Sequence, residues 1–183
     1  MRGPFRIAFV CTGNRFRSVL ASAAFAAGAG DTPVTVESYG TLDLGPAAPL
    51  PGALRGAVAQ GLDVSANRAR ALSTADLVDV DLVVGFELEH VVSAIEHAGA
   101  AMERSFVLPE LLGLLDHVPP ESANDPITSA RSRVARAHAL RRADARHLLT
   151  EIRDPIELSD AEQDSIAREV CAQSRALAEQ LFS

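Results

Sequence analysis

Phe5-Arg-Ile-Ala-Phe-Val-Cys-Thr-Gly-Asn-Arg-Phe-Arg-Ser-Val19 contains, in order, an apolar run, a tight loop and the start of a helix. Gly13 lies where the chain must turn sharply, and an alanine-rich helical run from Val19 to Ala29 follows. A loop between a strand and a helix directs successive backbone N–H groups and the positive end of the helix at one point. The stretch therefore predicts an anion-binding loop at the end of the first strand.

Cys11 and Arg17, six residues apart, give this loop its chemical character. The positive field of a helix N-terminus and a nearby guanidinium favour the thiolate, which is the nucleophilic form of cysteine. The planar guanidinium of Arg17 can hold two phosphate oxygens at once. We expect a phosphate cradle that contains a nucleophile, although the spacing alone also allows a buried cysteine in an ordinary strand-to-helix turn.

Strand-like and helix-like runs alternate along the rest of the chain. The strand-like runs cover residues 5–10, 34–38, 81–86 and 105–108, and the helix-like runs cover 19–29, 52–61, 87–98 and 159–181, with a further helix start at 73–76. Such alternation predicts an α/β fold, in which helices cover both faces of a parallel sheet. Ligands bind beyond the carboxyl ends of such strands, where Cys11 lies.

Composition limits the classes of protein to consider. A chain of 183 residues, 48% hydrophobic with a net charge of -7, is expected to form a single domain over residues 1–183. We find no membrane span or signal peptide and expect a cytoplasmic protein without membrane association. The acidic balance argues against nucleic acid as a partner. Cys11 and Cys171 are far apart and lack metal-ligand spacing, so we expect neither a disulfide framework nor a metal or other cofactor.

A second catalytic group is needed if Cys11 attacks a phosphate ester, because the leaving oxygen requires a proton from a positioned acid. Two Asp-Pro pairs are candidates, Asp125-Pro126 and Asp154-Pro155, since proline holds the preceding residue in an extended loop conformation. Asp154 is the better candidate. It directly precedes the terminal helix, where a loop would pass near the carboxyl end of the first strand.

The chain resembles the low-molecular-weight protein tyrosine phosphatase family, which combines an N-terminal Cys, five residues and Arg-Ser with a late Asp-Pro before the last helix. Glu37-Ser-Tyr-Gly-Thr41 and Gly61-Leu-Asp-Val-Ser-Ala-Asn-Arg-Ala-Arg70 extend the resemblance between these two motifs. It implies a three-layer fold with a four-stranded parallel sheet, no metal, and a phosphocysteine intermediate. In that scheme Cys11 attacks, and Asp154 protonates the leaving oxygen and then activates water.

The resemblance also assigns supporting roles. Asn14 would hold the shape of the cradle together with Ser18 and Ser38, although ordinary turn or cap hydrogen bonding is an equal alternative for these three. Asn67 stands where many members have histidine. The loop that would bind phosphate, or inorganic phosphate and sulfate as ligands, consists of Thr12, Gly13, Asn14, Arg15, Phe16, Arg17 and Ser18.

Several positions around the loop and the cleft depart from the family pattern. The aromatic residues that usually flank the cleft are replaced by Ile156 and, approximately, by Leu42 to Leu44, so stacking contacts with a phenyl ring are missing. Phe16 replaces a second cysteine of many members. Arg15 stands where an apolar residue is usual; it either favours a more anionic substrate or is an exposed guanidinium without a specific role.

An arginine-rich helical insert is expected over residues 131–148, in a region that is usually shorter in the family. Residues Arg131 to Arg146 include six arginines and a single aspartate. A solvated helix face is the first interpretation, and a docking surface for a phosphorylated or acidic partner is the second.

The leading functional hypothesis is a cysteine-dependent phosphatase that hydrolyses a phosphomonoester, on either a protein phosphotyrosine or a small molecule. A second hypothesis is an arsenate reductase that uses an external low-molecular-weight thiol, because Cys171 resembles a small core residue rather than an internal electron relay. A third is a non-catalytic phosphate-binding regulatory module. Retention of a nucleophile and an acid together argues against the third.

Overall fold

A four-stranded parallel sheet forms the centre of the computed structural model, which describes residues 3–119, 125–143 and 150–182. The strand order is β2-β1-β3-β4, and all three pairings are parallel. The strands are β1 Phe5–Cys11, β2 Val34–Gly40, β3 Leu82–Gly85 and β4 Ser105–Val107. The predicted α/β fold with four parallel strands is therefore confirmed.

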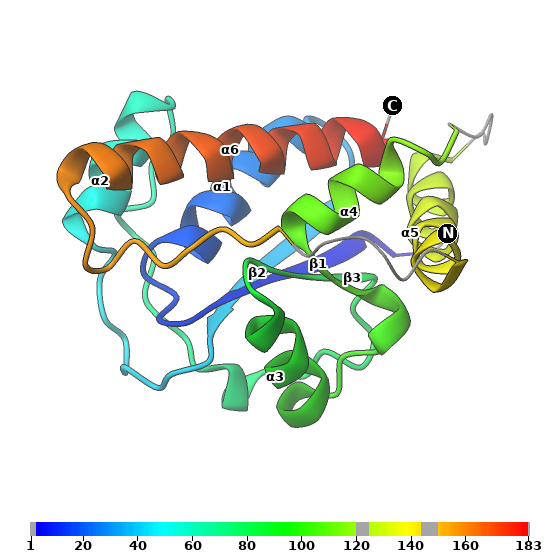
Figure 1. The fold of residues 1–183 in the computed structure, drawn as a ribbon, viewed down its shortest axis with the longest axis horizontal. Coiled ribbons are helices and arrows are strands. Elements are labelled where there is room, and N and C mark those ends of the chain that lie inside the picture. Colours follow the sequence, from blue (N-terminus) through cyan, green and yellow to red (C-terminus); the bar gives the residue numbers. More distant parts are fainter. Residues whose placement is uncertain (1–2, 120–124, 144–149, 183) are drawn as a thin grey trace.

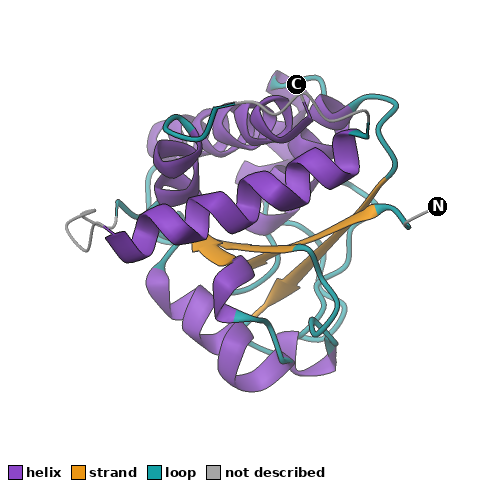
Figure 2. Ribbon diagram, turned by 90° about the vertical axis from the view of Figure 1, so that its right-hand side faces the viewer, coloured by secondary structure: helices purple, strands orange, loops and turns teal. Residues whose placement is uncertain are grey.

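Helices cover both faces of this sheet (Figures 1 and 2). The described helices are α1 Arg17–Ala29, α2 Pro51–Ala59, α3 Leu88–Ala98, α4 Leu108–Leu115, α5 Pro126–Ala143 and α6 Asp160–Phe182, with short 3-10 helices η1 Leu72–Thr74 and η2 Met102–Arg104. Helices α1, α2, α4 and α6 lie on one face, and α3 lies on the other (Figure 1). Among the described helices, none combines the length and the apolar character that crossing a bilayer requires.

Successive side chains of β1 point to opposite faces of the sheet, so this one strand contributes to two hydrophobic cores. Phe5, Ile7 and Phe9 belong to the larger core against α1 and α6, whereas Ala8 and Val10 belong to the smaller core against α3. Because both faces are buried, the strand reads as a continuous apolar run. Cys11, the last residue of β1, is in register with the larger core and comes at the carboxyl edge of the sheet.

At two places the predicted type of element was wrong. The helix start at residues 73–76 is only the 3-10 turn η1, because Thr74 Oγ1 donates back to the Ala71 carbonyl and Asp76 accepts from the Val78 amide within its own turn. The fourth strand ends at Val107, and Leu108 begins helix α4. Proline in the first turn suits a helix start, and Glu110 accepts from the Val107 amide, so the apolar run divides between strand and helix.

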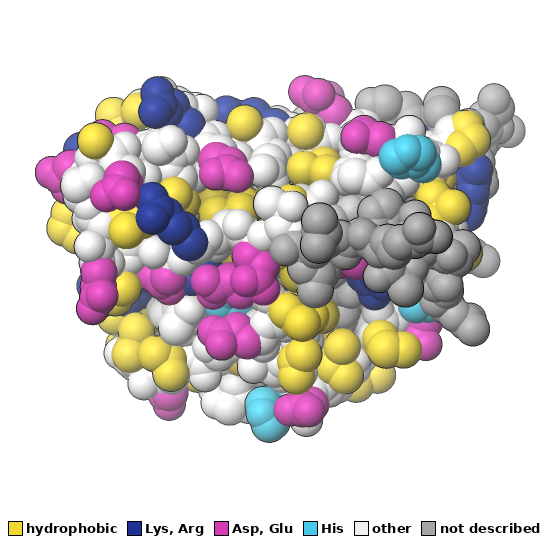
Figure 3. Space-filling view, viewed as in Figure 1, with side chains coloured by type: hydrophobic (Ala, Val, Ile, Leu, Met, Phe, Trp, Pro, Cys, Tyr) yellow, Lys and Arg dark blue, Asp and Glu magenta, His cyan; other side chains and the backbone are white. Residues whose placement is uncertain are grey.

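The arginine-rich segment is helical as far as Ala143, where the described part of α5 ends; residues 144–148 of the predicted insert lie outside the described residues. Its arginines do not form a solvated face throughout. Arg131 pairs with Asp81 at 2.8 Å, Arg133 is buried, and Arg141 lies over the Phe106 ring. On the face seen in Figure 3, Arg side chains form no continuous patch outside the grey atoms. These two contacts and the burial of Arg133 favour a packing role over a docking surface.

Candidate active site

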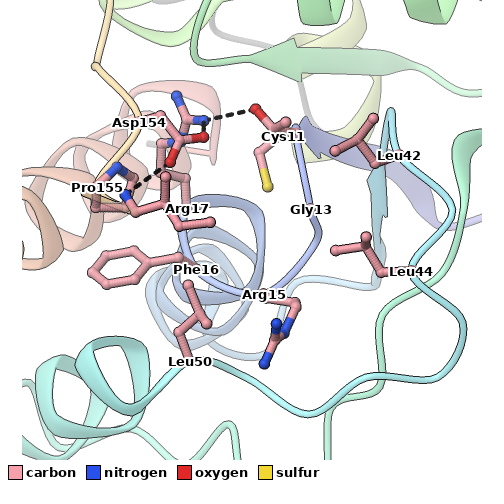
Figure 4. A pocket seen from close by; sticks show the side chains of 12 residues that line it. Cys11, Gly13, Arg15, Phe16, Arg17, Leu42, Leu44, Leu50, Asp154 and Pro155 are labelled. Atoms are coloured by element: carbon pink, nitrogen blue, oxygen red, sulfur yellow. Dashed lines mark hydrogen bonds and ion pairs between the residues drawn. The ribbon is translucent and has the colours of Figure 1, made fainter.

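The loop after β1 has the backbone of an anion cradle. Among the described residues, none of the N–H groups of residues 13–18 donates to a protein acceptor. These donors and the N-terminus of α1, which begins at Arg17, are therefore available to an anion. The sequence prediction of a strand, a loop and a helix start agrees with this arrangement, shown in Figure 4.

Asn14 fixes the shape of the loop. It is buried and is the described non-glycine residue with a positive φ, at 50°. Its Nδ2 donates to Ser18 Oγ and to Ser38 Oγ, both at 2.9 Å, and its Oδ1 accepts from the Arg70 amide at 2.9 Å. Asn67 Nδ2 donates to the Asn14 carbonyl at 3.5 Å. The two segments that carry the family resemblance between the main motifs thus both converge on Asn14.

Gly40 allows β2 to approach the loop. A Cβ at this position would lie 2.8 Å from the Gly13 carbonyl carbon and 2.9 Å from the Asn14 nitrogen, which are backbone atoms that cannot move aside. The next two amides, of Thr41 and Leu42, donate to the Cys11 and Thr12 carbonyls at 2.9 Å. A glycine here is therefore required for the loop to rest against the end of β2.

Cys11 faces the cavity from the end of β1 (Figure 4). Its Sγ lies 3.0 Å from Ser18 Oγ, in the first turn of α1. Ser18 also receives the Asn14 amide, so its hydroxyl hydrogen is free to point at the sulfur. A hydroxyl donor to sulfur stabilises the thiolate over the thiol. Ser18, which the resemblance assigns to the support of the cradle, is therefore also in contact with the cysteine.

Arg17 crosses the bottom of the site and is only 1% exposed. Its Nη1 donates to the Ile152 carbonyl at 2.8 Å and lies 3.1 Å from Glu87 Oε2. Its Nη2 donates to Thr12 Oγ1 at 3.0 Å and pairs with the Asp154 carboxylate. The Nη1 edge of the guanidinium is thus held by the surrounding fold, whereas the Nη2 edge contacts Thr12 and Asp154, which line the cavity.

The two Asp-Pro candidates occupy different places. Asp154 lines the cavity with Cys11 and is held by Arg17 and by the Ile156 amide, which donates to its Oδ1 at 2.9 Å. Asp125 instead caps α5, accepting from the amides of Ile127 and Thr128. The Thr128 hydroxyl also donates to this carboxylate, and that bond, followed by the two amide bonds, holds the pKa of Asp125 below its ordinary value. The structure brings Asp154, and not Asp125, to the cysteine.

His90 and Glu87 are neighbours of the site that sequence reasoning missed. His90 is buried, its Nδ1 accepts from the Glu87 amide at 3.1 Å, and its Nε2 lies 3.2 Å from Thr12 Oγ1. The amide donor to Nδ1 places the ring proton on Nε2, which can then donate to Thr12. The signal that could have found them is their position directly after β3, the strand beside β1 at the same edge of the sheet.

Glu87, Glu89 and His90 place three potential metal-ligand atoms within 4.8 Å of one another. Glu87 is already paired with the Arg17 guanidinium, and Glu89 is exposed. We therefore assign no metal to this cluster.

The pKa of His90 is lowered to about 3, mainly by burial and further by the positive charge of Arg17, with Asp154 acting in the opposite direction. Replacing His90 with Gln should make the fold less sensitive to acid. The unfolded chain takes up a proton on this residue below about pH 6.5, whereas the folded protein does not, so wild-type stability falls as pH decreases through that window. Between about pH 6.5 and pH 5, the free energy of unfolding should drop by about 1.6 kcal/mol more in wild type than in the variant. Urea unfolding at both pH values measures the difference.

His97 provides the control for this measurement, because it lies on the same helix but its side chain is 67% exposed. His97→Gln should keep the pH dependence of the wild type. Equal acid sensitivity of the wild type and His90→Gln would show that the buried ring does not resist protonation.

The cavity above the loop has a volume of about 290 Å³. Apart from Phe16 of the loop, its apolar walls are aliphatic and come from three segments. Leu42 and Leu44 follow β2, Leu50 precedes α2, and Ile156 follows the Asp-Pro pair; all four line the cavity with Phe16 and Pro155. Leu42 is 53% exposed and Ile156 67% exposed, so they form the rim. The predicted replacement of aromatic walls is thus confirmed at these positions.

Cys171 is buried within α6, as expected of a small core residue. Burial raises the pKa of its thiol to about 11. It does not line the cavity that contains Cys11. An internal transfer of electrons between the two cysteines is therefore not supported.

Comparisons with known proteins agree with this geometry. The family model for low molecular weight phosphotyrosine protein phosphatase matches residues 6–119. No curated protein sequence matches the chain. Similar solved structures include a low molecular weight protein tyrosine phosphatase from T. tengcongensis, with a TM-score of 0.70 and 21% identity, covering 96% of this chain and 98% of that one.

Two further structures share the fold. The YwlE arginine phosphatase from Geobacillus stearothermophilus has a TM-score of 0.70 and 21% identity, covering 97% and 93% of the two chains. The tyrosine phosphatase Wzb from Escherichia coli K30, in complex with sulphate, has a TM-score of 0.65 and 19% identity, covering 97% and 98%. With the family match over more than half of its residues and this shared fold, the chain belongs to the low molecular weight phosphotyrosine protein phosphatase family and is a cysteine-dependent phosphatase.

Proposed function

We propose that this phosphatase hydrolyses phosphomonoesters through a phosphocysteine intermediate on Cys11. The observation that carries the proposal is that Asp154, which lies far from the loop in the sequence, lines one cavity with Cys11 and Arg17 of the loop. Each has the chemistry that one part of the reaction needs: a nucleophile, an oxyanion clamp and a proton donor. The proposed reaction requires no metal or other cofactor.

In the first step, the phosphate group lies in the cradle of residues 12–18, with its oxygens on the loop N–H groups and on the cavity edge of Arg17. The Cys11 thiolate attacks phosphorus, a sulfur–phosphorus bond forms, and the bond to the leaving oxygen breaks. That oxygen takes a proton from the Asp154 carboxyl group. The fixed donors of the loop need no reorganisation as charge develops, which is the basis of electrostatic catalysis.

Asp154 is paired with Arg17 Nη2 in this structure. A phosphate dianion competes for the same nitrogen, because its oxygens bring more negative charge to the guanidinium. We propose that substrate takes this edge of Arg17, and that the released Asp154 takes up a proton from solvent and turns toward the leaving oxygen. The second edge keeps its bonds to Glu87 and to the Ile152 carbonyl, so the guanidinium stays in place.

In the second step, Asp154, now a carboxylate, removes a proton from water. The water oxygen attacks phosphorus, the sulfur–phosphorus bond breaks, and inorganic phosphate leaves. The thiolate that returns is stabilised by Ser18, whose Oγ lies 3.0 Å from the sulfur.

We further propose that a single domain carries this activity in the cytoplasm, on a phosphorylated protein or a small phosphomonoester. Both described cysteines are unpaired, and the proposed nucleophile must stay reduced, which suits a reducing compartment. Inorganic phosphate or sulfate would bind the same loop as a product-like ligand.

Acid quenching during turnover of para-nitrophenyl phosphate tests the intermediate. The peptide containing Cys11 should gain the mass of one phosphoryl group, and Asp154→Asn should increase the trapped fraction for this substrate, because its second step loses the base. A peptide containing Cys171 provides the internal control. Turnover without any phosphorylated cysteine would contradict the proposal, and arsenate-dependent thiol oxidation without ester hydrolysis would favour the reductase.

A further inference from the structure

Arg15 lies at the rim of the cavity, on the side opposite Asp154 (Figure 4). It is the fourth residue after Cys11, and its side chain extends between Leu44 and Leu50 in this view. Arg17, the other arginine of the loop, has both edges engaged by carboxylates. Within the part of the chain that the structure describes, Arg15 makes no ion pair.

The guanidinium of Arg15 is held in place by one bond. Its Nε donates to the Ala48 carbonyl at 2.7 Å, and its own carbonyl accepts from the Leu50 amide at 2.9 Å. The loop that supplies both partners contains Pro46, Pro49 and Pro51, which restrict its backbone. With Nε committed to a carbonyl, the two terminal nitrogens are left to bind an anion. An anchored guanidinium loses less conformational entropy on binding than a free one.

An aliphatic surface separates Arg15 from the cysteine. Leu44 closes over the loop, since a Cβ on Gly13 would lie 3.2 Å from Leu44 Cδ1, and Leu50 lines the cavity beside it. A substrate that reaches from the cradle to Arg15 must therefore cross apolar side chains. Burying polar groups against such a surface without partners is unfavourable, so an apolar connection is preferred.

We propose that Arg15 binds a second anionic group of the substrate, and that the preferred phosphomonoesters carry this anion behind a short apolar spacer. The inference rests on the proposed phosphatase function and specifies its substrate class. The second anion is a carboxylate or a phosphate, since both match the guanidinium fork. It belongs either to a small molecule or to an acidic residue beside a phosphorylated side chain.

Matched ester pairs test the inference. One member is an alkyl phosphate, and the other has the same chain ending in a carboxylate; release of inorganic phosphate gives kcat and KM for each over a series of spacer lengths. Wild type should prefer the carboxylate ester by about 3- to 10-fold in kcat/KM, the size expected of one partly exposed charge-assisted contact. The preference should appear mainly in KM, and it should shrink as salt screens the contact.

Three variants locate the effect. Arg15→Gln should reduce the preference to about one, and Arg15→Lys should retain part of it, because the charge remains without the fork. Arg104→Gln is the control for lost charge, since Arg104 precedes β4 at the opposite edge of the sheet and should leave the preference intact. Only ratios between paired esters are compared, so a general loss of rate in a loop variant does not affect the result.

A second arm uses phosphopeptides that differ only by Asp or Asn beside the phosphorylated residue. An Arg15-dependent preference in the ester arm alone identifies a small-molecule substrate, and one in the peptide arm alone identifies a protein. Equal kcat/KM values within both pairs, or a preference that persists in Arg15→Gln, would overturn the inference while leaving the phosphatase intact. If wild type hydrolyses neither these substrates nor para-nitrophenyl phosphate, the proposed function fails and the inference fails with it.

Discussion

Replacing Cys11 with serine should lower kcat for para-nitrophenyl phosphate by about 10⁴-fold or more, the largest effect we expect from any single substitution. A serine hydroxyl is not ionised at neutral pH, and the Ser18 hydroxyl that lies 3.0 Å from the sulfur cannot supply a base. The cradle itself should survive, because its donors are backbone N–H groups and Arg17. Steady-state kinetics measure the loss, and calorimetry with vanadate should show that the variant still binds an oxyanion.

Cys171→Ala is the matched control, since it removes the other thiol of the chain. Its position in the core predicts a modest loss of stability with kcat unchanged. A Cys11→Ser variant that keeps more than about a tenth of wild-type kcat would exclude Cys11 as the nucleophile.

Asp154→Asn should slow hydrolysis of alkyl phosphates by about 10² to 10⁴-fold. Asparagine can keep the hydrogen bond from the Ile156 amide, but it cannot give up a proton. The loss should be smaller for para-nitrophenyl phosphate, whose leaving group departs with little assistance. Kinetics over a series of leaving groups should therefore show a steeper dependence on leaving-group basicity in the variant than in wild type.

Asp125→Asn tests the competing assignment. Because Asp125 caps α5, this change should lower thermal stability and leave the leaving-group dependence unchanged. If the general-acid signature follows Asp125 and not Asp154, the proposed proton donor is wrong.

The fold could be predicted from sequence where local pattern and burial agree. β1 and β3 are apolar on both faces because helices cover the sheet on both sides, and α6 shows helical spacing through Ile166, Val170 and Leu177. The hydrophobic pattern gave a wrong prediction where one apolar run contains the end of a strand and the start of a helix, as at Leu108. It also failed at Ser73, where cap-like residues close a single turn instead of starting a helix.

The proposed catalytic loop is likewise a local feature. Cys11, Gly13, Asn14 and Arg17 lie within seven consecutive residues, so their spacing and the strand and helix around them already define a phosphate cradle. Local sequence did not distinguish Asp154 from Asp125. The choice of Asp154 also rested on its position before the last helix and on the family resemblance. The two Asp-Pro pairs are alike in sequence.

The sequence by itself determined the loop, the proposed nucleophile in it and the layered α/β fold, because these depend on neighbours along the chain. The tertiary structure alone decided which groups surround Arg17, namely Glu87, Asp154 and the Ile152 carbonyl. It also decided that Arg15, at the rim of the cavity, has no acidic partner among the described residues. The tertiary structure likewise pairs Arg131 with Asp81 and Arg141 with Glu110, which lie in other parts of the chain. Those contacts join residues tens of positions apart, and their free energy depends on distance and burial, which no local pattern contains.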